Sequence, residues 1–250
     1  MARIPIALQL YSVREDCKRD LPGTLAAVAK MGYEGVEFAG YYDRTASELR
    51  KMLDDLGLKV AGTHTGLNTL EADQLKATIE FNQTLGNRFL IVPWIDAEKL
   101  SSRQACAEIG RTLDGIAAQL RPLKMHTGYH NHSHDFAAVD GATPWDLLAQ
   151  STGPDVVLQL DIGNAMHGGA DALAYLRKYA DRGLTIHLKE FSKTKDKVII
   201  GEGDVNWKEV FDICESTGKT EWYIVEQESY PYPPLEAAER CLKNLRAMGK

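Results

Sequence analysis

Four histidines occupy even-numbered positions within nine residues of this chain. In the segment GYHNHSHDF (128–136), His130, His132 and His134 occupy alternate positions, and His126 lies four residues before the first of them. Because alternate side chains of a β-strand point to one face, an extended segment here would present several imidazoles together. A neutral imidazole can bind a metal ion or accept a proton near neutral pH. The segment is a candidate for either chemistry, and a solvated polar loop is the alternative.

Ionisable residues also interrupt or end three apolar runs further along the chain. VVLQLD ends at Asp161, LTIHLKE contains His187, and EWYIVEQ contains Glu226. Each of these groups would be costly to bury without a charge partner. Two carboxylates and one imidazole suit Mn²⁺, Zn²⁺, Co²⁺ or Mg²⁺, and ligand chemistry alone does not choose among them. We therefore predict that these three residues bind one divalent metal ion.

The elements that must position these residues alternate regularly along the chain. Short apolar runs predict eight strands, at residues 5–12, 35–38, 59–64, 88–93, 123–131, 156–161, 184–190 and 221–227. Amphipathic stretches between them predict helices at 20–32, 45–57, 74–86, 101–120, 143–150, 171–180, 206–217 and 234–248. The first three of these helices finish on Gly, a common residue at helix C-termini.

Eight strand–helix units in 250 residues predict an α/β fold, a single (β/α)8 TIM barrel. A doubly wound open sheet is the alternative, but it normally has a Gly-rich phosphate loop after its first strand, and LYSVRED contains no Gly. No linker or low-complexity segment divides the chain, so we expect one domain over residues 1–250. In TIM barrels the reacting groups lie at the C-terminal ends of the strands, where these polar residues fall.

Composition argues against several classes of protein. The net charge is −6 and Lys and Arg do not cluster, so nucleic acid is not expected as a partner. No run approaches the roughly 20 apolar residues that span a bilayer, and the first residues do not read as a signal peptide. The four cysteines form no Cys-x-x-Cys pair, which predicts reduced thiols. We therefore expect a cytoplasmic protein that is not bound to a membrane.

Six short segments, in this order and spacing, resemble the xylose isomerase-like TIM-barrel superfamily, the sugar phosphate isomerase/epimerase group. They are GVEF (35–38), GYHNH (128–132), LDIGN (160–164), HLKE (187–190), GEGDVNW (201–207) and IVEQ (224–227). The resemblance covers essentially the whole chain. It implies one metal ion at the barrel mouth, with Mn²⁺ the first choice and Zn²⁺, Co²⁺ or Mg²⁺ as alternatives. An acid on strand 5 would hold this ion with Asp161, His187 and Glu226, and a carbohydrate would bind through vicinal oxygens.

The chain departs from the epimerase branch at the end of strand 5. That branch has a Glu there, which is both ligand and acid/base and pairs with the Glu of strand 8, whereas this chain reads His130-Asn131-His132. The branch with YHNH usually has Glu five residues after its first His, and this chain has Asp135 at that position. We predict Asp135 as the fourth ligand, with His130 and His132 as competitors. This branch is similar to inosose dehydratases and to enzymes that eliminate across 3-keto sugars.

The chemistry that follows is proton abstraction alpha to a sugar ketone. A metal ion that chelates a ketone and its neighbouring hydroxyl stabilises the enediolate as it forms. We predict His132 as the base, with His130 as second choice, and Glu226 as a further catalytic group. His167, in NAMHGGAD, is predicted to protonate a leaving group. The expected reaction is elimination or dehydration, or isomerisation.

Five further residues are predicted to contact the carbohydrate substrate. Glu37 and Lys189 would hydrogen-bond sugar hydroxyls, with a barrel-end salt bridge as the alternative for each. Trp94 would stack on a sugar face, and His64 in GTHTG has room to reach a ligand. Asn131 completes this predicted set.

Three other functions remain open from the sequence. One is a ketose epimerase or aldose–ketose isomerase, and another is a non-catalytic sugar-binding barrel. The third, an endonuclease of the same superfamily, needs a richer metal cluster and a basic face. A homo-oligomer is compatible with every one of these functions.

Overall fold

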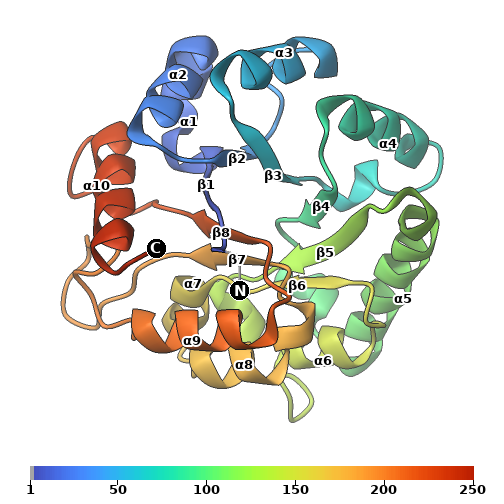
Figure 1. Ribbon diagram of the computed structural model, residues 1–250. Helices are drawn as coiled ribbons and strands as arrows, with labels where there is room; N and C mark the ends of the chain where they lie inside the picture. Colours follow the sequence, from blue (N-terminus) through green and yellow to red (C-terminus); the bar gives the residue numbers. More distant parts are fainter. Residues whose placement is uncertain (1–2) are drawn as a thin grey trace.

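The computed structural model describes residues 3–250 and contains eight parallel strands in one sheet. The strands are β1 (Ile6–Gln9), β2 (Gly35–Ala39), β3 (Lys59–His64), β4 (Phe89–Val92), β5 (His126–His130), β6 (Val157–Gln159), β7 (Thr185–Leu188) and β8 (Trp222–Val225). They stand at the centre of a ring of helices (Figure 1). Neighbouring strands pair in the order β6-β5-β4-β3-β2-β1-β8-β7.

The ring closes between β6 and β7 with little backbone pairing. There the residues described show one isolated bridge between Asp161 and His187, and the His187 N–H donates to the Leu160 carbonyl at 3.0 Å. All the other neighbouring strands share a parallel ladder. The predicted TIM barrel is confirmed, and two predicted metal ligands lie where its sheet is least hydrogen-bonded.

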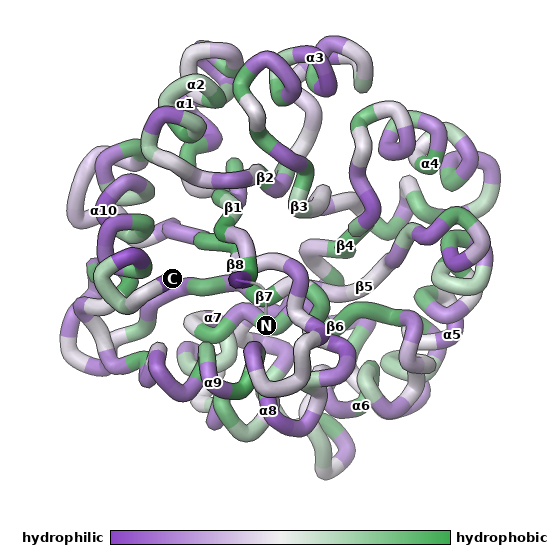
Figure 2. Tube along the Cα trace, in the orientation of Figure 1, coloured by the Kyte–Doolittle hydropathy of each residue, from purple (hydrophilic) through white to green (hydrophobic). Residues whose placement is uncertain are grey.

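The helices that cover the barrel match the eight predicted ones closely. They are α2 (Leu21–Met31), α3 (Ala46–Leu56), α4 (Gln74–Leu85), α5 (Arg103–Leu120), α6 (Pro144–Gln150), α8 (Ala172–Lys178), α9 (Trp207–Thr217) and α10 (Pro234–Ala247). Two short helices, α1 (Arg14–Arg19) and α7 (Ile162–His167), were not predicted. Hydrophobic and hydrophilic residues alternate along the outer helices, as expected when one side packs on the barrel (Figure 2).

Buried apolar side chains form two separate cores. The larger one lies between strands and helices and includes Leu90 and Val225. The smaller one, which we call the floor, contains the alternate residues of the same strands. The floor consists of Ala7, Ala61, Phe89, Ile91, Val157, Trp222 and Ile224. Since adjacent strand residues point to opposite faces, the floor fills the interior of the barrel.

Within residues 3–250, no helix combines the length and hydrophobicity that crossing a bilayer requires. The four cysteines are all buried and free.

Candidate active site

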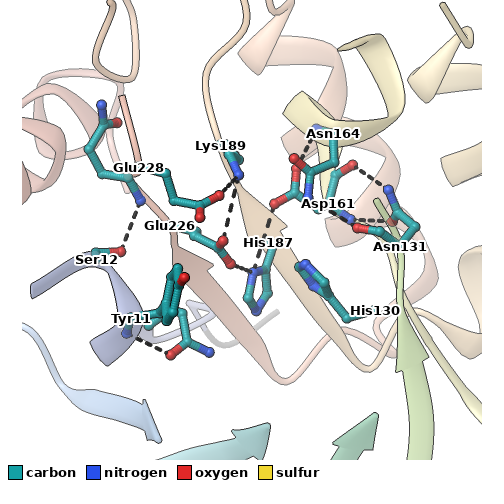
Figure 3. Close-up of polar contacts among 12 residues, drawn as sticks. Tyr11, Ser12, His130, Asn131, Asp161, Asn164, His187, Lys189, Glu226 and Glu228 are labelled. Atoms are coloured by element: carbon teal, nitrogen blue, oxygen red, sulfur yellow. Dashed lines mark hydrogen bonds and ion pairs between the residues drawn. The ribbon is translucent and has the colours of Figure 1, made fainter. Parts of the chain in front are cut away.

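Four ionisable side chains come together at the C-terminal ends of β5 to β8. His130, Asp161, His187 and Glu226 each offer one ligand atom, and these atoms all lie within 4.8 Å of one another. All four side chains are buried. Figure 3 shows them converging from neighbouring strands. We call these four residues the cluster. Three of them were predicted as metal ligands, and the fourth, His130, was a competitor for the remaining position.

One carboxylate oxygen of Asp161 accepts a hydrogen bond, and the other has no hydrogen-bond partner. The Asn164 N–H donates to its Oδ1 at 2.6 Å, while its Oδ2 is buried without a hydrogen-bond partner. The side chain of Asn131 clamps the Asp161 backbone, accepting from the N–H at 2.7 Å and donating to the carbonyl at 3.2 Å. A buried carboxylate oxygen without a partner is costly, and a cation would relieve that cost. This oxygen shows that the cluster fits a divalent metal ion.

His187 lies between two carboxylates. Its Nδ1 is 2.6 Å from Glu226 Oε2, and its Nε2 is 2.7 Å from Glu37 Oε2. Burial lowers the pKa of His187, but Glu37 and Glu226 outweigh that effect and raise the pKa to about 10. Without a metal, the ring therefore carries a proton on each nitrogen. A metal ion would replace the proton on Nδ1, and Glu37 would keep the ring oriented through Nε2–H.

His130 is neutral and has one nitrogen available. Burial among other imidazoles holds its pKa well below the ordinary value. Gln159 donates through Nε2 to Glu37 and to the Thr185 hydroxyl, both at 2.9 Å, so its Oε1 is left to accept. His130 Nδ1, at 3.2 Å from that oxygen, is therefore a donor, and its Nε2 keeps a free lone pair. A neutral nitrogen of this kind can bind a metal ion.

Asp135 does not join the cluster. Both its oxygens accept from the Tyr129 hydroxyl, at 2.9 and 3.0 Å, and Oδ2 also accepts from the His132 N–H at 2.6 Å. Its side chain is fully buried in a 3₁₀ turn over residues 133–136. In the structure Asp135 shapes the turn after β5, and His130 stands in the place for which we had predicted Asp135.

Glu37 also lies away from the cavities that could take a substrate. It is fully buried beneath the cluster, where it accepts from Gln9 at 2.7 Å and lies 3.2 Å from His64 Nε2. A β-carbon at position 62 would come within 2.6 Å of Glu37 Oε1, so the Gly at that position makes room for the carboxylate. Burial opposes ionisation of Glu37, but His64 and His187 outweigh it and hold its pKa below the ordinary value.

Two cavities open above the cluster. The inner one, of about 410 Å³, is lined by Tyr11, His64, Pro93, Trp94, His130, His132, Glu226 and Glu228. The outer one, of about 560 Å³, is lined by Ser133, Asn164, His167, Lys189, Glu190, Ser192, Lys195, Asp196, Val198, Glu228 and Ser229. Five predicted site residues outside the cluster line these cavities. His64, Trp94 and His132 line the inner cavity, and His167 and Lys189 line the outer one.

His132 and Trp94 form one wall of the inner cavity. Their ring centroids lie 4.6 Å apart in an edge-to-face arrangement, and Trp94 is 51% exposed. Burial lowers the pKa of His132 to about 4, so the ring is neutral at physiological pH. β5 ends at His130. Of the other three histidines of this segment, only His126 lies on the same strand, at its other end, where its ring stacks on Phe89. The histidine run is thus divided between a strand and the turn after it.

His167 and Lys189 belong to the outer cavity. His167 is the last residue of α7, a helix that the sequence did not predict, and burial lowers the pKa of its imidazole. Lys189 Nζ pairs with Glu228 and lies 3.6 Å from Glu226 Oε1. Lys189 thus forms the salt bridges considered as the alternative and also lines a cavity, and its contact with a sugar stays a prediction.

Several residues of the site were not predicted. Gln159 stands two positions before Asp161 in an apolar strand, and this polar interruption was a signal that could have identified it. Glu228 follows Glu226 at the same strand end, which marked it as polar without predicting a role, and Tyr11 left no comparable pattern. Glu190 also has a structural role, since it accepts from the N–H groups of Phe191, Gly201 and Val205 and from the indole of Trp207.

Comparison with known proteins assigns the family. Residues 25–248 match the model of the xylose isomerase-like TIM barrel. This chain belongs to that family. An inosose dehydratase from Clostridium perfringens is 24% identical over 262 residues, covering 89% of this chain and 88% of the relative. The rhizopine catabolism protein MocC from Rhizobium meliloti is 24% identical, covering 90% of this chain and 80% of the relative.

Solved structures show the same fold. A sugar phosphate isomerase/epimerase from Parabacteroides distasonis has a TM-score of 0.87 at 21% identity, covering 99% of this chain and 97% of that one. The IOLI protein with a bound zinc atom has a TM-score of 0.72 at 15% identity, covering 98% and 97%. The predicted family is confirmed, and so is the prediction of an enzyme of the isomerase, epimerase or lyase type.

Proposed function

We propose that this protein is a metal-dependent enzyme that removes the proton alpha to the ketone of a carbohydrate and then eliminates water or an alcohol from the neighbouring carbon. The observation that carries the proposal is the buried, partnerless Oδ2 of Asp161 within the cluster. The zinc atom in the IOLI structure and the inosose dehydratase relatives support the same interpretation. Manganese is the ion we propose first, and metal analysis decides between manganese and zinc.

The cluster would hold the metal ion through His130, Asp161, His187 and Glu226. When bound, the ion would polarise a ketone and acidify the adjacent C–H bond. Residues of the chain would orient these ligands and contact the substrate. Glu37 orients His187, Asn131 and Asn164 orient Asp161, and Trp94 offers an exposed ring against which a sugar face can pack.

His132 would accept the proton in the inner cavity. Its low pKa keeps the ring neutral, which an acceptor requires. His167, in the outer cavity, would donate a proton to the departing oxygen. The C–H electron pair forms the new double bond, the C–O bond on the next carbon breaks, and the oxygen leaves as water or an alcohol. The two cavities meet at Glu228, so a substrate lying across that boundary would reach both histidines.

Proton exchange tests this proposal directly. The metal-loaded protein is incubated with 3-keto sugars and inososes in heavy water, and deuterium is sought at the carbon alpha to the ketone. We expect His132→Gln to keep the metal and to lose exchange by about 10²–10⁴-fold. We expect His167→Gln to keep exchange but to form no eliminated product. Conversion of a free ketose into its C3 epimer by the wild type, with no enone or dehydrated product, would contradict the elimination.

Nucleic acid is not part of this proposal. The net charge of −6 argues against a phosphate backbone as ligand. Salt-sensitive DNA binding at micromolar concentration would overturn the carbohydrate interpretation.

A further inference from the structure

Glu228 stands where the two cavities of the barrel mouth meet. It lines both of them, and its side chain is 34% exposed, against 12% for that of Lys189. Lys189 Nζ pairs with Glu228 and lies 3.6 Å from Glu226 Oε1. Figure 3 shows this ammonium group between the two carboxylates. Its charge is therefore shared by two acids before any ligand arrives.

The mouth as a whole has an excess of negative charge. Among the described residues that line the inner cavity there are two carboxylates, those of Glu226 and Glu228, and no Lys or Arg. Asp161 and Glu37 lie buried below them. These four carboxylates outnumber the three positive charges that Lys189 and a divalent metal ion would supply. An anionic ligand would thus enter a region that is already negative.

The other nearby cations reduce this excess but do not make the mouth positive, even though the charge of Glu228 helps to raise the pKa of Arg14 against the effect of burial. The Arg14 guanidinium lies 4.2 Å from the centre of the Tyr11 ring and donates to the Tyr11 carbonyl and the Tyr230 hydroxyl. Lys195 lines the outer cavity, where Asp196 lines it too. A phosphate group would need a surplus of donors and positive charge, which neither residue offers at the inner cavity.

We propose that Glu228 is a specificity-determining residue, which makes the site select an uncharged sugar over its phosphorylated counterpart. The inference rests on the proposed function and names the substrate class of that same site. A neutral sugar can donate hydroxyl hydrogens to the Glu228 carboxylate and accept from Lys189. A phosphate ester carries up to about two negative charges and meets like charge at the boundary of both cavities. The penalty falls on binding, before any chemistry.

The test is a binding measurement with D-fructose and D-fructose 6-phosphate. Isothermal titration calorimetry on the Mn²⁺-loaded protein gives a dissociation constant for each, and their ratio is the readout. We expect the phosphate ester to bind at least about tenfold more weakly than the free ketose. In Glu228→Gln, which keeps size and hydrogen bonding, this ratio should fall at least about fivefold. Glu236→Gln, on the surface of α10, is the matched control and should leave the ratio unchanged.

The outcomes separate the two proposals. Binding of the phosphate ester as tightly as the free ketose in the wild type overturns the inference while leaving a carbohydrate site in place. A ratio that does not change in Glu228→Gln also overturns it, because the selection would then come from elsewhere. If neither compound binds to the metal-loaded protein, the inference fails, whereas the proposed function is decided separately by the deuterium exchange with 3-keto sugars and inososes.

Discussion

The interior of the barrel has two levels with opposite chemistry. The floor is entirely apolar, whereas a few residues further along the same strands the interior contains the cluster. On β8, Trp222 and Ile224 belong to the floor, and Glu226 follows them on the same face. On β6, Val157 is followed by Gln159 and Asp161.

The difference separates stability from chemistry along single strands. Floor residues exclude water and contribute the free energy of burial, while cluster residues are held by hydrogen bonds in a position that costs desolvation energy. Substitutions at the two levels should therefore have different consequences. The predictions below compare these consequences, beginning with the largest expected effect.

Removing a cluster side chain that was predicted as a metal ligand should abolish metal binding and activity. Asp161→Ala, and likewise His187→Ala or Glu226→Ala, removes a group that would bind the ion directly. Elemental analysis should show a fall from near one metal ion per chain, together with complete loss of turnover. Asp155→Ala removes an exposed carboxylate that pairs with Arg121, and it is the control that should keep both. Full metal occupancy in the Asp161 and Glu226 variants would rule out this ligand assignment.

Removing a floor side chain should reduce stability without removing the metal. Ile224→Ala opens a cavity in the barrel interior and should lower the free energy of unfolding by about 2–5 kcal/mol. Urea denaturation measures the loss, and metal content per folded chain should stay the same. Leu123→Ala, at a 41% exposed position, is the matched control and should change little. Loss of metal from folded Ile224→Ala would contradict the separation of stability, assigned to the floor, from metal binding, assigned to the cluster.

Asn131 connects the two adjacent strand ends and should act through Asp161. Asn131→Ala removes both hydrogen bonds to the Asp161 backbone, so metal affinity should fall about 10–100-fold. Competition with a chelator of known affinity measures this change. Asn68→Ala, at an exposed position in the segment after β3, serves as the control. The structure places Asn131 fully buried and outside the lining of both cavities, not in the substrate contact first predicted for it, and an unchanged affinity would show that its two hydrogen bonds do not position Asp161 for the metal.

Metal affinity should rise with pH by about tenfold per unit. In the metal-free protein the pKa of His187 is about 10, because its two carboxylate neighbours outweigh burial. Between about pH 8 and 9 the ring is thus protonated on both nitrogens while Asp161, whose pKa burial raises to about 7, is ionised, so a metal ion must displace one proton, that on Nδ1. Acidification therefore weakens binding and alkaline pH strengthens it. Calorimetry in buffers of different ionisation enthalpy counts the released protons, and a count of zero would exclude His187 as a ligand.

Much of the fold and part of the site follow from local sequence. Strands and helices were predictable because apolar runs and amphipathic stretches alternate, and the C-terminal residues of α2, α3 and α4 are followed by Gly in a left-handed conformation. Asp161, His187 and Glu226 were recognisable because a charged group inside an apolar strand needs a partner. The short helices α1 and α7 had too few residues to show a period.

The sequence by itself determined which residue types stand at the strand ends, and only the tertiary structure decided which of them meet. From the sequence we predicted Asp135 as the fourth ligand, with His130 as a competitor, but β5 ends at His130, and the turn after it directs Asp135 onto Tyr129. Glu37 reads as a sugar contact until the closed barrel brings its side chain, across the interior, into contact with His187 of β7, 150 positions away in the chain. These pairings depend on closure of the sheet and on where each strand stops, and both are set by packing between segments far apart in the chain.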